Sequence, residues 1–102
     1  MEMKLYDEGD LRDTKYRSAK EPWEFIADLP GDNPDLFEDL DNNSLTERLK
    51  AYGVIKECDV ADPETCCSYV YFVDKRHGLR FIKKLNEYIL EKARLLEQSA
   101  NF

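Results

Sequence analysis

The chain has 102 residues, a formal net charge of −7 and an apolar share of 42%, which suffices for one hydrophobic core and a single domain. It has no apolar run approaching the roughly 18 residues of a membrane span, and no charged segment followed by an apolar leader. Three cysteines, without the composition of a disulfide scaffold, favour a reducing compartment. We therefore expect a soluble, cytoplasmic protein.

Acidic residues are concentrated in the first part of the sequence. Residues 1–41 contain 13 acids and 5 bases, a balance of −8, whereas residues 42–102 contain 9 acids and 10 bases, a balance of +1. Between Glu21 and Glu47 there is no Lys or Arg. Such a run is usually a solvated surface, and the alternative is a surface that binds a basic protein partner through residues 21–47.

Three segments make up the predicted domain. Residues 1–20 have mixed charge and no hydrophobic period, which indicates an extended N-terminal arm able to pack across a partner subunit. Residues 21–74 are expected to form the core, and residues 75–102 a C-terminal dimerisation helix.

The core segment opens with two short predicted helices. Pro22 suits a first helical position, and the apolar residues after it predict a helix that ends at Pro30 and Gly31. The pair Asn33 and Pro34 is typical of a cap and first turn, so a second helix is predicted from Pro34 to about Leu40.

A third helix is predicted from Ser44. Ser44 and Glu47 have the spacing of a capping box, in which the hydroxyl and the carboxylate each accept from a free backbone amide. Leu45 and Leu49 form an apolar stripe, and Gly53 supplies the backbone freedom that a helix C-terminus requires.

A β-hairpin is predicted next. The β-prone runs VIKECDV and CCSYVYFV flank a turn-forming cluster around Asp62 and Pro63. If the turn centres on these two residues, Val54 faces Tyr71, Ile55 faces Val70 and Cys58 faces Cys67.

The cysteines leave alternatives open. Cys58 and Cys67 would be close enough across the hairpin to form a redox pair, although small buried side chains are the commoner role. Cys58, Cys66, Cys67 and His77 lack the paired C-x-x-C spacing of zinc sites, so we predict no metal and no cofactor. His77 is expected to be exposed at a helix start.

The last predicted helix covers about Lys75 to Glu97, over 30 Å at ~1.5 Å per residue. So long a helix has more apolar surface than one small domain can bury, which favours a two-fold homodimer. The alternative is a core helix with an exposed fringe. The predicted interface residues are Leu79, Ile82, Leu85, Ile89, Ala93 and Leu96.

The order of short helix, glycine, hairpin and long helix resembles the second half of a winged helix-turn-helix domain. The segment LTERLKAYGVI, from Leu45 to Ile55, is similar to the recognition helix of the MarR and HxlR families of transcription regulators. The strand Ser68 to Val73, followed by DKRHG from Asp74 to Gly78, resembles the end of their wing. The resemblance covers roughly the C-terminal half and implies an α+β, mostly helical fold with a two-stranded wing.

On this reading, the third helix lies in the major groove of double-stranded DNA. Polar residues on and after this helix are the candidate DNA contacts: Asn42, Asn43, Ser44, Thr46, Glu47, Arg48, Lys50 and Lys56. The alternative for Ser44 and Glu47 is that they only cap the helix.

No motif typical of an enzyme occurs, because the sequence has no phosphate-binding glycine loop, no H-E-x-x-H and no G-x-S-x-G. Two functions remain. The first is a sequence-specific, homodimeric DNA-binding transcription regulator. The second is an acidic winged-helix interaction module, or a nucleic-acid mimic, that does not bind DNA.

Overall fold

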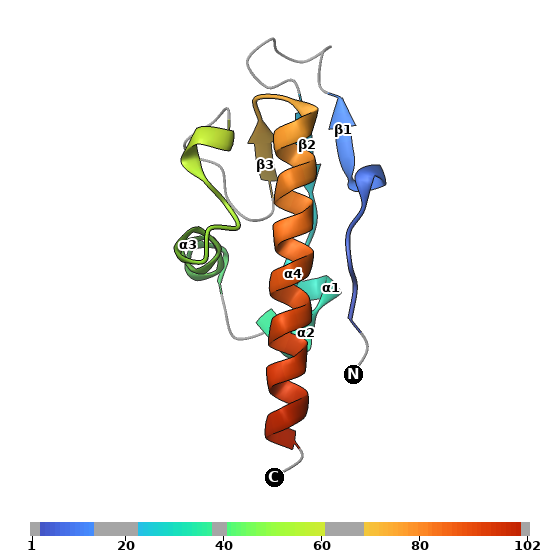
Figure 1. Ribbon diagram of the computed structural model, residues 1–102, viewed down its shortest axis with the longest axis vertical. Coiled ribbons are helices and arrows are strands. Elements are labelled where there is room, and N and C mark those ends of the chain that lie inside the picture. The colour runs from blue at the N-terminus through green and yellow to red at the C-terminus, as the bar shows by residue number, and fades with distance from the viewer. Residues whose placement is uncertain (1–2, 14–22, 38–40, 61–68, 101–102) are drawn as a thin grey trace.

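The computed structural model describes residues 3–13, 23–37, 41–60 and 69–100, and the molecule measures 51 × 24 × 20 Å (Figure 1). Within these residues, three strands form an antiparallel sheet in the order β1-β2-β3, and a long helix, α4, packs against it. The predicted α+β, mostly helical fold class is confirmed. The elements in chain order are η1 Glu8–Asp10, β1 Leu11–Asp13, β2 Trp23–Ile26, α1 Leu29–Asp32, α2 Pro34–Phe37, α3 Asn42–Ala51, η2 Glu57–Asp59, β3 Tyr69–Phe72 and α4 Lys75–Ala100.

The predicted first helix is wrong, because its central residues form β2 at the middle of the sheet. Phe25 pairs with Leu11 on one side and with Val70 on the other. Its ring is fully buried and packs edge-on against Phe81 of α4, with ring centroids 5.0 Å apart. A segment of four residues is too short for a helical period to be distinguished from the alternating period of a strand. Burial of the Phe25 ring by the sheet outweighs the preference of Pro22 for the start of a helix.

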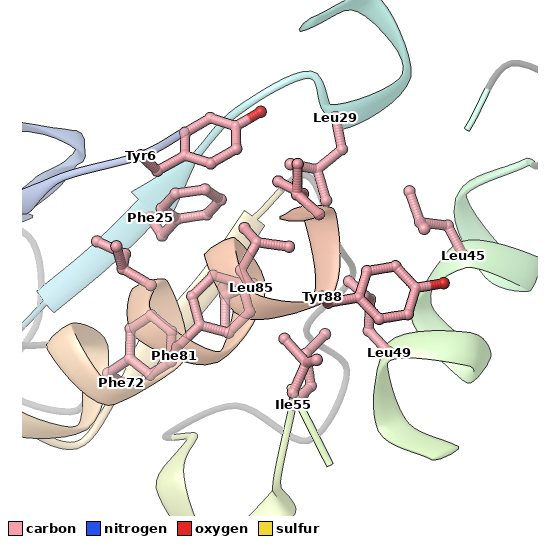
Figure 2. Packing of buried hydrophobic residues seen from close by; sticks show 14 of the residues in the cluster. Tyr6, Phe25, Leu29, Leu45, Leu49, Ile55, Phe72, Phe81, Leu85 and Tyr88 are labelled. Atoms are coloured by element: carbon pink, nitrogen blue, oxygen red, sulfur yellow. The ribbon is translucent and has the colours of Figure 1, made fainter. Parts of the chain in front are cut away.

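Helix α4 supplies one wall of the core. Phe81, Leu85 and Ile89 are buried on the face that packs against the sheet and α3 (Figure 2). Gly78, in the first part of α4, is buried where β1 crosses the helix, and a Cβ there would lie 2.9 Å from a methyl group of Leu11. Gly78 therefore allows close packing of β1 on α4.

The described part of the N-terminal arm packs along its own chain. The backbone N–H of Tyr6 donates to the side-chain amide oxygen of Asn86 at 2.9 Å, and the amide nitrogen of Asn86 donates to the Tyr6 carbonyl at 2.8 Å. Asn33 makes the same pair of bonds with the backbone of Lys4. The side-chain amides of Asn86 and Asn33 thus satisfy backbone N–H and C=O groups of the arm, as a neighbouring strand would. The arm is therefore a part of the monomer's fold.

The predicted hairpin register is also wrong. The partner of β3 is β2, with Val70 opposite Phe25 and Tyr71 opposite Glu24. On the other edge of β3, Val60 is the one described residue that forms a bridge, to Phe72. Val54 and Ile55 face the core at the end of α3 and do not pair with β3, and the turn with Cys66 and Cys67 lies outside the described residues.

Candidate nucleic-acid interface

Helix α3 begins earlier than the sequence indicated, and Asp41 caps it. The carboxylate of Asp41 accepts from the backbone N–H of Ser44 at 2.7 Å, and the Asp41 carbonyl accepts from the N–H of Leu45. The predicted capping box of Ser44 and Glu47 is therefore wrong. Aspartate is as good an N-cap as serine and also interacts favourably with the helix dipole, so the cap moves to Asp41.

The end of α3 is fixed by Gly53. This residue has φ +74°, and its N–H donates to the carbonyl of Lys50 at 3.0 Å while the N–H of Val54 donates to that of Leu49 at 2.8 Å. This is the Schellman arrangement, which favours glycine because of the positive φ. The predicted C-terminus at Gly53 is confirmed. The turn directs Val54 and Ile55 into the core.

Helix α3 has one buried and one exposed face. Leu45 and Leu49 are fully buried and point toward Tyr88 of α4 (Figure 2). Thr46 is only 6% exposed, so its predicted role as a DNA contact is wrong. The reason is its place beside Leu45 on the inward side of the helix.

The remaining predicted contacts are distributed as follows. Ser44, Glu47, Arg48 and Lys56 are exposed, and Lys50 is half-buried. Asn42 and Asn43 lie in the first turn of α3, and their side chains are outside the description. The described part of this surface thus contains three bases and one carboxylate.

The arginine of this surface lies near a buried tyrosine. Burial raises the pKa of the Tyr88 hydroxyl, and the positive charge of Arg48 opposes that shift.

An ionic cluster centred on the buried carboxylate of Asp59, which sequence reasoning missed, joins η2 to the start of α4. The Asp59 side chain is 9% exposed, and its Oδ1 lies 3.2 Å from a guanidinium nitrogen of Arg80 and 3.5 Å from Nε2 of His77. The other ring nitrogen of His77 lies 2.6 Å from Asp74 Oδ1. We call Asp59, Asp74, His77 and Arg80 the η2 clamp.

The η2 clamp overturns the expectation that His77 is exposed, since its side chain is 16% exposed. Hydrogen bonds from the backbone N–H and the ring of His77 hold the pKa of the Asp74 carboxyl below its ordinary value. In the sequence, Asp59 is separated by 15 residues or more from its partners on α4, so no local sequence motif predicts the cluster. The only feature of the sequence that pointed to this cluster was the single histidine, His77. Cys58, exposed beside it, has its Sγ 3.7 Å from Asp59 Oδ1.

The predicted dimer stripe on α4 requires correction. Ile82, Leu85, Ile89 and Ala93 are buried inside the monomer, because α4 packs against the sheet and α3 with this face. Leu79 and Leu96 remain exposed. The other exposed leucines of α4 are Leu90 and Leu95, so the free apolar surface lies mainly toward the C-terminal end, where the helix extends past α1 and α2 (Figure 1).

A small open cavity of about 140 Å³ lies between the end of α3 and α4. It is lined by Tyr52, Val54, Lys84, Glu87, Tyr88 and Glu91. The rings of Tyr52 and Tyr88 meet edge to face at 5.3 Å, and the Lys92 ammonium lies over both. Acidic and basic groups balance around the cavity, so it favours neither sign of charge.

Among the described residues, no group of three or more His, Cys, Asp or Glu side chains is placed to hold a metal ion. None of the described helices combines the length and the apolarity needed to cross a bilayer. Comparisons with protein-family models, with curated proteins and with solved structures found no match.

Proposed function

We propose that this protein is a sequence-specific DNA-binding transcription regulator of winged-helix type. The observation that carries the proposal is the presentation of α3. Two buried leucines and a Schellman turn hold one face of α3 on the body, while Ser44, Glu47 and Arg48 face solvent. A short helix held in this way has the dimensions that a major groove accepts.

The order of elements also supports a winged helix. Strand β2, helices α2 and α3, the bridge at Val60, strand β3 and a long final helix follow one another. The sheet places β3 between β2 and Val60, so Val60 stands where the first strand of a wing would pair. A strand hairpin, β1 with β2, takes the place of an N-terminal helix.

Four of the carboxylates have structural partners within the chain, although each still contributes to the net charge of −7. Asp28 and Asp41 cap helices, Asp32 lies 3.6 Å from the Lys4 ammonium, and Asp59 is buried in the η2 clamp. These carboxylates have local structural roles. The bases of α3 and Lys56 remain exposed or half-buried and are available to phosphate.

We further propose a homodimer that pairs through the C-terminal turns of α4. Leu90, Leu95 and Leu96 are 39–48% exposed, and α4 extends beyond the body there. Pairing of two such ends would bury apolar surface and set a fixed distance between two copies of α3.

The test is selection of duplexes from a random-sequence library, followed by titration of a selected duplex at low and moderate salt. The wild type should enrich a defined sequence, and Arg48→Ala with Lys50→Ala should weaken binding and reduce the salt dependence. Lys92→Ala is the matched control, because it removes a base of α4 on the cavity side. Recovery of no duplex even at low salt would refute the proposal.

A second candidate is an acidic module that binds a basic protein. It is favoured by the exposed carboxylates of the α1 to α3 region, namely Asp28, Asp35, Asp41 and Glu47. If this is the function, the chain will bind polylysine but no duplex, and Asp35→Asn with Glu47→Gln will weaken that binding.

A further inference from the structure

The basic residues are not concentrated on α3 but on the first turns of α4. Residues 75–84 contain five of the 15 Lys and Arg residues and no Asp or Glu. Over this length a solvated helix face normally mixes both signs of charge. The segment therefore forms a local positive surface on an acidic protein.

Ion pairing inside the chain leaves part of this positive charge uncompensated. Lys75 pairs with Glu8, Arg80 with Asp59 and Lys84 with Glu87. Within the described part of the chain, Arg76 and Lys83 form no ion pair and both are exposed, although the charge of Arg76 acts on the nearby Asp74 carboxylate. They are seven residues apart on one face of the helix, a separation of ~10 Å along its axis.

The η2 clamp connects the segment after α3 to the first turns of α4. Asp59 bonds Arg80 through its carboxylate, and its backbone N–H donates to the carbonyl of Lys56 at 3.0 Å. The clamp thereby fixes η2 against the first turns of α4, while the side chain of Lys56 lies over Gly53 at the end of α3. Asp59 is the first acidic residue after Lys56 whose side chain is described. The clamp keeps its carboxylate buried, away from this surface.

The acidic helices α1 and α2 are distant from Arg76, although exposed Glu87 follows Lys83 by one helical turn. The helices α1 and α2 pack near the middle of α4, where Phe37 stacks on Tyr88 at 6.2 Å (Figure 1). Tyr88 follows Arg76 by twelve residues, or ~18 Å of helix. At physiological salt the screening length is about 8 Å, so charges at that distance contribute little.

We propose that Arg76 and Lys83, supported by Arg80, form a second phosphate-binding surface for double-stranded DNA. This inference rests on the proposed function and extends it to a surface outside α3. Duplex DNA is the partner that fits, because each strand presents a phosphate about every 3.4 Å and a ~10 Å row of bases spans several of them. A basic row of this kind positions the protein on the backbone and reads no sequence.

The experiment is an anisotropy titration of a labelled duplex between about 50 and 200 mM salt, with the full-length chain. The variants are Arg76→Gln, Lys83→Gln and their double substitution, and the matched control is Arg94→Gln, an exposed arginine further along the same helix. Each lost phosphate contact should lower the slope of log affinity against log salt by about 0.9, and the affinity roughly 5- to 10-fold near 0.1 M salt. The double variant should lose about twice that slope and the control none.

Other outcomes separate this inference from the proposed function. If Arg48→Ala weakens binding but Arg76→Gln and Lys83→Gln leave the slope unchanged, the second surface is refuted and DNA binding by α3 stands. If Arg94→Gln lowers the slope as much as Arg76→Gln, the effect is one of net charge and the inference fails. If the wild type binds polyglutamate and no duplex, both proposals fail. Far-ultraviolet circular dichroism must show that the variants are folded.

Discussion

Replacement of Leu49 by alanine tests whether α3 is held on the body as described. Leu49 is fully buried between α3 and α4, where it lies beside Tyr88 and Ile55 (Figure 2). Removal of a buried leucine side chain costs about 2–5 kcal/mol through lost transfer energy and the cavity left behind. Because Leu49 has no exposure, we expect a loss of ~3 kcal/mol, against about 5–15 kcal/mol for a whole domain. This corresponds to a decrease in Tm of roughly 12–24 °C.

The assay is urea unfolding followed by circular dichroism, with Glu47→Ala as control. Glu47 is exposed on the same helix, so its truncation should change the free energy of unfolding by no more than ~0.5 kcal/mol. A loss below ~1 kcal/mol for Leu49→Ala would refute the packing of α3 on α4. The outward presentation of Arg48 would then lose its support.

The remaining predictions concern the arm, the η2 clamp and the end of α4. Asn86→Ala should destabilise the protein by about 2–3 kcal/mol in urea unfolding, because it leaves the backbone N–H and C=O of Tyr6 without their partners. The lowered pKa of the Asp74 carboxyl adds stability above its unfolded pKa of about 3.9, and this is lost as the pH falls through the folded value. Asp74→Asn should therefore flatten the decline of the urea midpoint below about pH 4. Leu90→Asp should lower the mass measured by sedimentation at high concentration from dimer to monomer.

Each of these three predictions would be contradicted by a specific result. An Asn86→Ala protein as stable as the wild type would mean that the arm is not held by that amide. For the pH series, Glu91→Gln on the same helix is the control, and equal flattening by both variants would rule out a special role of Asp74. A wild type that stays monomeric at high concentration would refute the dimer.

Long and strongly periodic segments were predictable from the sequence. The final helix was found because its apolar residues keep a helical period over more than six turns, and it runs from Lys75 to Ala100. The end of α3 was found because Gly53 marks a positive φ. Which partner covers the apolar face of α4 was not predictable, since the same stripe suits a dimer and a monomer core.

Three of the errors share one physical origin, which is competition from distant parts of the chain. Residues 23–26 become a strand because β1 and β3 are available on both sides and Phe81 covers Phe25. The wing register was wrong because Val60, and not Val54 or Ile55, bridges one edge of β3, while β2, more than 40 residues away, pairs with the other edge. The η2 clamp was missed for the same reason, since its carboxylates and bases meet only in the folded state.

The most direct test of the central claim is chemical-shift mapping of the ¹⁵N-labelled protein during titration with a selected duplex. We predict that the amides of Asn42–Ala51 shift first and most, together with those of residues 75–84. Shifts confined to residues 23–37, or an unchanged spectrum at low salt and saturating duplex, would contradict DNA recognition by α3.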